Sequence, residues 1–504
     1  MTNLSHNLTE SAEMYAGRPA LRMGDQTLTY AAFDAAASRL ASLVASLGMK
    51  PGDRVGVMLP NITAFPIIFY GVLRAGGVVV PMNPLLKHAE VEYYLEDSGA
   101  KIIFAWDAVA GEAAQAAEEA GAKLFAVGSD FAAALTVHAP VEGDLPRDDE
   151  ETAVILYTSG TTGKPKGAEL THANLNRNQA VTVSTLINLT PDDVVMGCLP
   201  LFHVFGLTCG LNASVASGSL LTLLPRFDGR QALEIVQRDR VTVFEGVPTM
   251  YSAMLAVPDG TAYDTSTLVT CVSGGAALPV EVLRSFESAF EVMVLEGYGL
   301  SETSPVASFN HPDRERKPGS IGTPIAGVEM RAVDLEGNEV PRGEVGEIQI
   351  KGHNVMKGYW RRPQATAEAI RDGWFSTGDL ARVDEDGYYF IVDRKKDLII
   401  RGGYNVYPRE VEEVLYEHPA VAEVAVVGIP HPTLGEEVGA AVSLKAGAQA
   451  TPEELVAFAK ERIAAYKYPR LVWVLEGLPK GPTGKILRRE VRAPQRAEAA
   501  PKEH

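Results

Sequence analysis

Short apolar runs alternate with longer amphipathic stretches over the first half of this chain. The runs cover residues 54–59, 101–105, 123–127, 153–156 and 241–244, and the stretches between them include 30–47. Apolar strand-length runs that alternate with helical segments are typical of parallel sheets with helices on both faces. The sequence therefore predicts an α/β fold, and its length of 504 residues predicts at least two domains.

The character of the sequence changes twice towards the C-terminus. From about residue 319 glycines are frequent and the expected strands are short, as at 346–350 and 387–392, which predicts a small antiparallel barrel or sheet. After Gly402 and Gly403 we expect a compact domain with helices at 408–418 and 452–464 and strands at 424–428, 439–444 and 471–474. The charged segment 393–397 separates the two patterns, so we place the domains at 1–394 and 395–504.

Composition and charge exclude several classes of protein. A net charge of −18 disfavours nucleic acid and anionic membranes as partners, because the overall field repels them. The longest apolar stretch, 62–73, is interrupted by Pro66 and is too short to span a bilayer, so we expect no integral membrane segment. Residues 1–20 lack the features of a secretory signal, and the three cysteines lack metal-ligand spacing. These features predict a cytoplasmic protein with reduced thiols.

A loop rich in hydrogen-bond donors follows the apolar run 153–156. Its sequence, YTSGTTGKPKG at 157–167, holds three glycines, four serine or threonine hydroxyls and two lysines. Glycine lets backbone N–H groups turn towards one point, so such a loop suits a phosphate group. It is not a Walker A loop, because Pro165 stands five positions after Gly160 where that motif needs glycine. Taken alone, the loop is also compatible with a solvated turn.

Three further motifs accompany this loop along the chain. They are EGYGLSET at 296–303, STGDL at 376–380 with DRKKDLIIRGGYNVYP at 393–408, and PKGPTGKILRR at 479–489. In order and spacing these motifs resemble those of the acyl-adenylate-forming superfamily, over roughly residues 10–490. The whole chain is most similar to the acyl-CoA synthetase branch, which includes fatty acyl-CoA and 4-coumarate–CoA ligases.

The resemblance implies both a fold and a reaction. The fold would be a large N-terminal domain of two doubly wound α/β subdomains and a small β-barrel, followed by a small α+β C-terminal domain that swivels. The reaction would use ATP and Mg²⁺ to convert a small-molecule carboxylic acid to acyl-AMP. Coenzyme A, the cosubstrate, would then displace AMP. The resemblance implies a monomer or a homodimer.

The resemblance also locates the nucleotide contacts. It implies that ATP or AMP is bound by Thr158, Ser159, Gly160, Thr161, Thr162, Gly163, Lys166, Gly274, Gly275, Ala276, Gly297, Tyr298, Gly299, Asp379 and Arg394. Tyr298 would stack on adenine, and Asp379 and Arg394 would hold the ribose. By its residue type alone, Asp379 could equally cap a turn.

Charged residues of the same motifs are the predicted catalytic groups. Glu302 is a carboxylate in a stretch of small and apolar residues, and its hard oxygen atoms suit Mg²⁺. The resemblance adds Thr162 as a second metal contact and Thr303 as a contact of the α-phosphate. Lys485 would bridge the substrate carboxylate and the α-phosphate, where the transition state concentrates negative charge. By composition alone it could be one more exposed lysine.

The resemblance assigns the second half-reaction to other residues. Lys396 matches the hinge position, and Gly402, Gly403 and Tyr404 would lie beside a tunnel for the pantetheine arm of coenzyme A. Charge runs such as 394–401 are more often solvated faces.

The acid that is activated is the least constrained feature. We predict an acyl pocket formed by His203, Val247, Gly275 and Gly297, with His203 as a gate that could equally be a core histidine. Residues 199–211 hold no acidic side chain, which disfavours amino acids. Malonyl-specific relatives carry arginine where Gly297 stands, so dicarboxylates are disfavoured too.

We expect Gly297 to leave an open slot for a medium- or long-chain fatty acid, with an aromatic or small acid as the alternative. A ligase that loads a carrier protein, a luciferase-like oxygenase and a non-catalytic nucleotide sensor remain open. The presence of Lys485, Glu302 and Asp379 disfavours the sensor.

Overall fold

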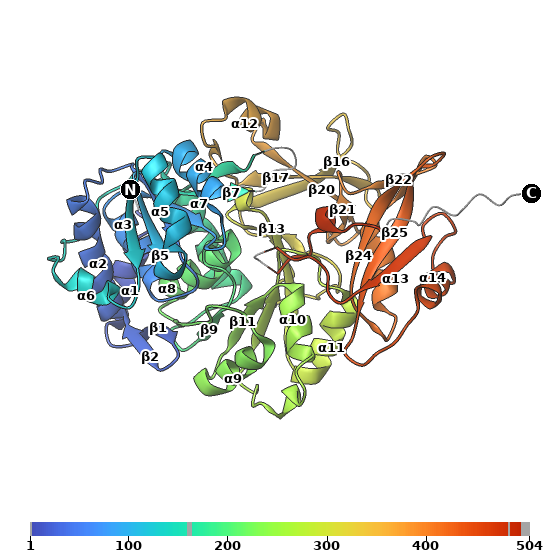
Figure 1. The fold of residues 1–504 in the computed structure, drawn as a ribbon, viewed down its shortest axis with the longest axis horizontal. Helices are drawn as coiled ribbons and strands as arrows, with labels where there is room; N and C mark the ends of the chain where they lie inside the picture. The colour runs from blue at the N-terminus through green and yellow to red at the C-terminus, as the bar shows by residue number, and fades with distance from the viewer. Residues whose placement is uncertain (1–2, 159–163, 482–483, 495–504) are drawn as a thin grey trace, which may run out of the picture.

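The first large sheet contains the parallel strands predicted for the N-terminal region. A computed structural model describes residues 3–158, 164–481 and 484–494 of the chain (Figure 1). The seven-stranded sheet runs β18-β8-β7-β4-β3-β5-β6. Its strands are β3 (Arg54–Met58), β4 (Val78–Met82), β5 (Ile102–Trp106), β6 (Lys123–Val127), β7 (Thr152–Thr158), β8 (Lys166–Thr171) and β18 (Gly358–Tyr359). Strands β3 to β7 pair in parallel, and β8 and β18 add an antiparallel edge.

The second large sheet has nine strands, in the order β15-β14-β13-β12-β11-β9-β10-β1-β2. Its strands are β1 (Pro19–Met23), β2 (Gln26–Thr29), β9 (Val194–Gly197), β10 (Leu220–Leu223), β11 (Val243–Gly246), β12 (Thr270–Ser273), β13 (Met293–Gly299), β14 (Val306–Phe309) and β15 (Thr323–Pro324). The N-terminal strand β1 pairs in parallel with β10, where Leu21 lies opposite Leu221. The first two strands of the chain thus belong to the second sheet. The strands that follow form most of the first sheet, and the chain then returns to the second sheet at β9.

Helices cover both sheets. They are α1 (His6–Tyr15), α2 (Tyr30–Ser46), α3 (Ala64–Arg74), α4 (His88–Ser98), α5 (Ala110–Glu119), α6 (Phe131–Thr136), α7 (His172–Val181), α8 (Ala213–Ser217), α9 (Gly229–Asp239), α10 (Pro248–Leu255) and α11 (Val280–Phe290). The predicted helix at 30–47 is α2, whose N-cap hydroxyl, from Thr29, accepts the backbone N–H of Ala32. Within the described residues, no helix has the length and apolarity needed to cross a membrane.

A smaller antiparallel sheet follows, as predicted from residue 319 onward. Its strands are β16 (Val328–Val333), β17 (Val345–Gly352), β19 (Ile370–Arg371), β20 (Trp374–Val383) and β21 (Tyr389–Arg394), and α12 (Pro363–Ala369) lies beside it. One apolar core is continuous through all three sheets, since it includes Val154, Val272 and Ile348. The part of the chain up to Arg394 therefore packs as a unit.

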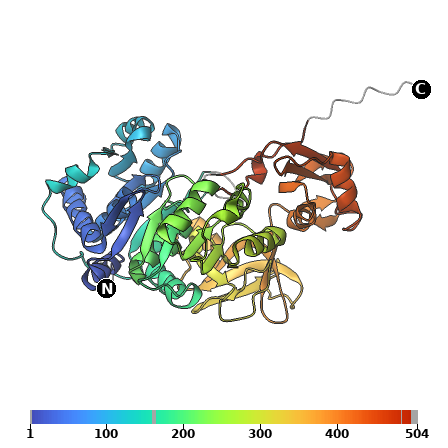
Figure 2. The same cartoon turned by 90° about the horizontal axis from the view of Figure 1, so that it is seen from below.

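The C-terminal domain has its own core around Val426, Val442 and Leu455. Its sheet contains β22 (Ile399–Arg401), β23 (Tyr404–Val406), β24 (Val421–His431), β25 (Gly435–Leu444) and β26 (Leu471–Leu475), covered by α13 (Pro408–Tyr416) and α14 (Pro452–Lys460). Figure 2 shows this domain beside the N-terminal domain at one end of the molecule. Because β21 ends at Arg394 and β22 begins at Ile399, residues 395–398 join the two domains.

The second sheet gathers predicted site residues from three neighbouring strands: Val247 follows β11, Gly274 to Ala276 follow β12, and Gly297 to Gly299 lie in β13. Strands β11, β12 and β13 are parallel, so their carboxyl ends and the following loops lie together. Beyond this edge β13 continues as an antiparallel partner of β14. A Cβ atom at Gly299 would lie 1.9 Å from the carbonyl oxygen of Pro305, so only glycine allows this close approach.

Candidate active site

Asp379 binds two of the residues that were predicted to contact the nucleoside. It lies on β20 directly opposite Arg394 of β21, and the Arg394 Nε atom is 3.3 Å from Asp379 Oδ1. The hydroxyl of Tyr298, from β13, donates a hydrogen bond of 2.6 Å to Asp379 Oδ2. Burial and the charge of Asp379 raise the pKa of Tyr298, so the phenol keeps its proton and acts as donor.

Glu302 is a buried carboxylate held by hydroxyl groups. It lies in the short helical turn Ser301–Thr303 after β13. Its Oε1 atom accepts hydrogen bonds from the Tyr359 hydroxyl at 3.0 Å and from Thr158 Oγ1 at 3.4 Å. Burial raises the pKa of Glu302, because its charge has lost contact with water. The sequence predicted no role for Tyr359, on β18, because this residue lies in no recognisable motif.

The predicted phosphate loop is described only at its two ends. Thr158 ends β7 and Lys166 begins β8, and the Lys166 Nζ atom lies 5.2 Å from the centre of the Tyr359 ring. Ser159, Gly160, Thr161, Thr162 and Gly163 lie outside the described residues, so their phosphate contacts, and Thr162 as a metal contact, stay predictions.

Thr303 is held within its own loop. Its Oγ1 donates a 2.6 Å hydrogen bond to the carbonyl of Pro305 and accepts one of 2.9 Å from the N–H of Leu300. The single hydroxyl proton is therefore used locally, and a side-chain bond to phosphate would need this hydroxyl to rotate. The α-phosphate contact of Thr303 stays a prediction.

Two glycines after β12 bring the chain close to its neighbours. A Cβ atom at Gly274 would lie 2.9 Å from the ring of Phe205, and one at Gly275 would lie 3.5 Å from Val247 Cγ1. Gly275 also has a φ of +76°, which favours glycine, and Ala276 follows it. The structure thus places Gly275 beside Val247, two residues predicted for the acyl pocket.

The open slot expected beside Gly297 is absent, and that expectation was wrong. Gly297 lies directly opposite Phe309 in the antiparallel β13–β14 pair. A Cβ atom at Gly297 would lie 2.7 Å from the Phe309 ring, which fills the predicted space. The sequence did not show that β14 folds back along β13, so the ring could not be foreseen. Participation of Gly297 in the acyl pocket stays a prediction.

His203 is a neutral imidazole near the predicted catalytic lysine. Burial and the positive charge of Lys485 lower the pKa of His203 to about 4. Its Nδ1 atom accepts the backbone N–H of Phe205 at 3.4 Å. At neutral pH this side chain is therefore an uncharged neighbour of Lys485.

The C-terminal segment carries Lys485 into the N-terminal domain. Gly484 has a φ of +80°, and its carbonyl oxygen accepts a 3.0 Å hydrogen bond from Thr249 Oγ1 of α10. Burial and the charge of Arg394 lower the pKa of Lys485 to about 8, while Asp379 acts in the opposite direction. Lys485, His203, Arg394 and Asp379, predicted from separate motifs, thus lie within electrostatic reach of one another.

Arg488 fixes this segment to the junction between the domains. Its guanidinium donates a hydrogen bond of 2.9 Å to Asp393 and one of 2.6 Å to Glu412 of α13. Asp393 precedes the junction and Glu412 follows it, so Arg488 links both sides. This arginine was not among the predicted site residues, because a basic residue near Lys485 has no distinctive sequence feature.

The predicted hinge and coenzyme A residues lie at the domain junction and in the C-terminal domain. Lys396 is exposed, while its neighbour Lys395 donates its N–H to Gly378 of the N-terminal domain at 2.9 Å. Gly402 donates its N–H to Leu434, and the ring of Tyr404 lies 4.9 Å from that of Tyr466. These contacts of the Gly402–Gly403–Tyr404 turn are with its own domain, so both roles stay predictions.

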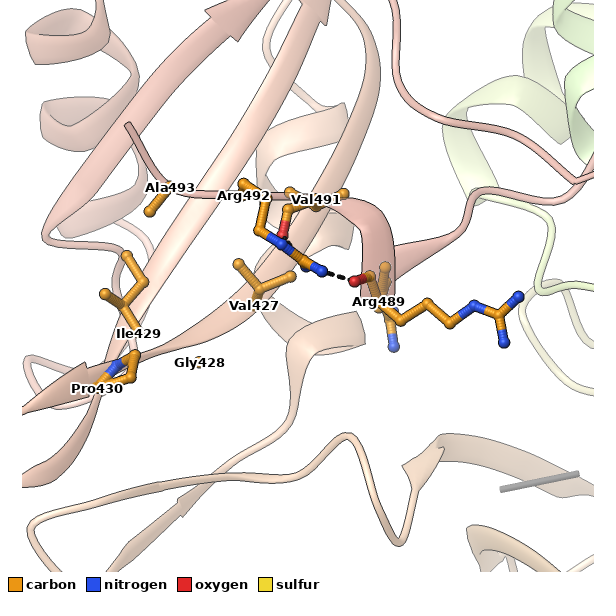
Figure 3. A pocket seen from close by; sticks show the side chains of 9 residues that line it. Val427, Gly428, Ile429, Pro430, Arg489, Val491, Arg492 and Ala493 are labelled. Carbon is orange, nitrogen blue, oxygen red and sulfur yellow. Dashed lines mark hydrogen bonds between the residues drawn. The ribbon is translucent and has the colours of Figure 1, made fainter. Parts of the chain in front are cut away.

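A hollow in the C-terminal domain shares Arg488 with this site. It has a volume of about 350 Å³ between the end of β24 and the segment after Lys485. Its lining residues are Val427, Gly428, Ile429, Pro430, Arg488, Arg489, Val491, Arg492 and Ala493 (Figure 3). It includes none of the residues predicted for ATP, the acid or coenzyme A.

Comparisons with known proteins agree with this geometry. Residues 8–360 match the family described as AMP-binding enzyme, and residues 410–485 match the AMP-binding enzyme C-terminal domain. The chain belongs to this family. It is 40% identical to a long-chain-fatty-acid–CoA ligase of Bacillus subtilis, over 96% of this chain and 93% of the relative.

Two further relatives are close. The chain is 40% identical to a feruloyl-CoA synthase of an Amycolatopsis species, over 95% of this chain and 96% of the relative. Its structure is similar to that of ATP-bound MatB from Rhodopseudomonas palustris, with a TM-score of 0.91 and 34% identity over 97% of each chain. The protein is thus an AMP-forming acid–thiol ligase that uses ATP, Mg²⁺ and coenzyme A.

The residues around Glu302 fit a magnesium ion. The two side chains that donate to its carboxylate, Tyr359 and Thr158, are neutral hydroxyls. A bound cation would therefore offset the cost of burying this charge, and carboxylate and hydroxyl oxygens are ligands that Mg²⁺ accepts. When bound, the ion would neutralise phosphate charge as pyrophosphate leaves.

The position of Lys485 predicts a selective loss. Lys485→Ala should lower acid-dependent ATP–pyrophosphate exchange by roughly a hundredfold or more, because the variant would lack the cation that is predicted to face the developing charge. Thioester formation from supplied acyl-AMP and coenzyme A should remain near that of the parent enzyme. Equal loss in both assays would contradict a role confined to adenylation.

The lowered pKa of Lys485 predicts a pH dependence. Since the ammonium is the active form, kcat/KM for ATP in the exchange assay should fall by about tenfold per pH unit above pH 8. The thioester step, assayed from acyl-AMP at the same pH values, is the control and should lack this decline. An exchange rate that stays constant up to about pH 9.5 would show that Lys485 titrates elsewhere.

Proposed function

We propose that this ligase activates medium- or long-chain fatty acids to their coenzyme A thioesters. The observation that carries the proposal is the apolar surroundings of Gly274 and Gly275, where the ring of Phe205 and the side chain of Val247 lie. The 40% identity to the Bacillus subtilis fatty acid ligase supports the same choice. The buried segment 206–212, with Leu207 and Leu211, adds apolar surface next to His203.

Aromatic acids are the second candidate. The feruloyl-CoA synthase relative is as similar to this chain as the fatty acid ligase. The rings of Phe205 and Phe309 lie beside Gly274 and Gly297, and such rings can stack on an aryl group. We further propose a cytoplasmic location, which the buried free thiols of Cys198, Cys209 and Cys271 support.

In the proposed first half-reaction the residues of this chain mainly hold charge in place. Asp379, with Tyr298 and Arg394, would orient the ribose, and the glycines 274–275 would admit the adenine. Lys485 would lie between the acid and the α-phosphate, where its charge would offset that of the transition state. His203, neutral at pH 7, would border the acyl group without competing as a cation.

In the proposed second half-reaction the C-terminal domain rotates about Lys396. The rotation would withdraw Lys485 and bring Gly402, Gly403 and Tyr404 to the pantetheine arm. The contacts that must break for this include those of Gly484 with Thr249, Arg488 with Asp393, and Glu413 with the N–H of Val280. Arg409 of α13 adds hydrogen bonds to Asp393, Ile391 and Gly319 of the N-terminal domain. These contacts are hydrogen bonds and ion pairs, so the interface can open without exposing a large apolar core.

A panel of acids tests the proposal. ATP–pyrophosphate exchange followed by coenzyme A trapping should give a kcat/KM for dodecanoate at least about tenfold above those for butyrate and malonate, because each buried methylene adds binding energy. A higher value for ferulate would favour the aromatic candidate. Transfer only to a carrier protein would contradict the choice of coenzyme A as acceptor.

The hinge is tested by paired variants. Lys396→Pro should spare pyrophosphate exchange and slow the thioester step by roughly tenfold or more, because proline fixes the backbone angle that a swivel must change. Lys396→Ala, which removes the side chain and leaves the backbone free, should behave like the parent enzyme in both steps. Thioester formation by the proline variant at the parent rate would place the pivot elsewhere.

A further inference from the structure

Glu245 is a carboxyl group buried in the centre of the second sheet. It lies on β11 between β12 and β9 and is only 1% exposed. Among the described residues, neither of its carboxyl oxygens has a hydrogen-bond partner. Buried polar groups in folded proteins are nearly always hydrogen-bonded, so a pair of unpartnered oxygens calls for an explanation.

The carboxyl group faces the segment that packs beside the predicted acyl site. Successive residues of β11 point to opposite faces, and Phe244 packs against Tyr251 and Phe286 on one of them. Glu245 is on the other face, where a Cβ atom at Gly210 would lie 3.5 Å from its Oε2 atom. Gly210 belongs to η3 (Gly206–Asn212), a wide π-helical turn of a type that is frequent at functional sites.

The same turn reaches the reaction end of the site. Phe205, at its start, lies against Gly274, and Gly274 follows the strand residue Ser273 that pairs with Gly246. The turn thus covers the ends of β11 and β12. It begins beside Gly274, one of the glycines predicted to contact the adenylate, and further along it lies against Glu245. An acyl chain that extended from Gly274 along this turn would approach Glu245 at a point remote from its own carboxylate.

The surroundings of Glu245 do not make it half of an ion pair. Burial alone raises the pKa of Glu245 to about 8, so at neutral pH it is mostly a carboxylic acid. The buried thiols of Cys198 and Cys209 lie close enough for its charge to raise their pKa values. A neutral carboxylic acid both donates and accepts a hydrogen bond, and so it suits a hydroxyl or a carbonyl group.

We propose that Glu245 determines substrate specificity by hydrogen bonding to an oxygen on the acyl part of the acid, either a hydroxyl or a carbonyl group remote from the carboxylate. This inference rests on the proposed function, since it places the acyl chain in the same site. A plain alkyl chain would leave the carboxyl group unpartnered. A chain that carries oxygen at this depth would satisfy it, and sites that bond a substrate hydroxyl discriminate strongly against analogues without it.

The test compares matched acids on the parent enzyme, Glu245→Gln and Glu245→Leu. The acids are dodecanoate with its positional hydroxydodecanoate isomers, and cinnamate with 4-hydroxycinnamate, which separates a hydroxylated chain from a hydroxylated ring. On the parent enzyme one hydroxylated acid should exceed its unsubstituted partner in kcat/KM by about tenfold or more. Glu245→Leu should abolish or invert that ratio, whereas Glu245→Gln, which keeps a donor and an acceptor, should retain most of it.

Each outcome bears on a distinct statement. A parent enzyme that prefers both unsubstituted acids, or a ratio that Glu245→Leu leaves unchanged, overturns the inference and leaves the ligase function standing. Failure of every acid in the panel overturns the proposed substrate and the inference with it. Thermal unfolding checks the fold: Glu245→Leu should melt at or above the parent temperature, since it removes an unpartnered buried group. If Glu245→Leu does not fold, the inference is judged from the kcat/KM ratio of hydroxylated to unsubstituted acid, measured on the parent enzyme and on Glu245→Gln.

Discussion

The enclosure of the Lys485 ammonium between two domains is the constraint on which the site depends. Water is displaced around this cation, so its attraction to phosphate and carboxylate oxygens is stronger than it would be on the surface. The same enclosure penalises the charge, which is why its pKa falls towards 8. Neither domain alone forms the surroundings of the Lys485 ammonium, because Arg394 and Asp379 precede the junction and Lys485 follows it. A bound nucleotide would add the negative charge that this arrangement lacks.

Much of the fold and part of the site followed from the sequence. Segments such as 30–47 and 123–127 have local patterns strong enough to fix helix and strand in advance, and the structure has them as α2 and β6. Tyr298, Asp379 and Arg394 meet because the motifs sit at strand ends and on adjacent strands, positions that the fold brings together. The resemblance implied that all three contact the nucleoside, but the hydrogen bond between Tyr298 and Asp379, about eighty positions apart, appears only in the structure.

Other features depend on long-range packing that no local pattern carries. The pairing of β13 with β14 put Phe309 next to Gly297 and removed a slot that the glycine alone had suggested. Tyr359 reaches Glu302 only because β18 pairs with β8 across a large sequence separation. In the sequence, Glu245 is an ordinary charged residue at the end of the run Thr-Val-Phe-Glu. Only the structure of the sheet shows that it is buried.

The place of β1 in the second sheet bears on how this chain is made. Leu21 pairs with Leu221, so during synthesis β1 has only β2 beside it until about two hundred further residues have supplied β10. The first sheet, by contrast, can assemble from β3 to β8 as each segment leaves the ribosome. Pairing with β10 therefore fixes the N-terminal segment, while β11 to β15 of the second sheet and β18 of the first sheet are still to be added. Non-local closure of this kind slows folding, and a chain stopped before β10 would leave β1 paired with β2 on one side and with an open edge on the other.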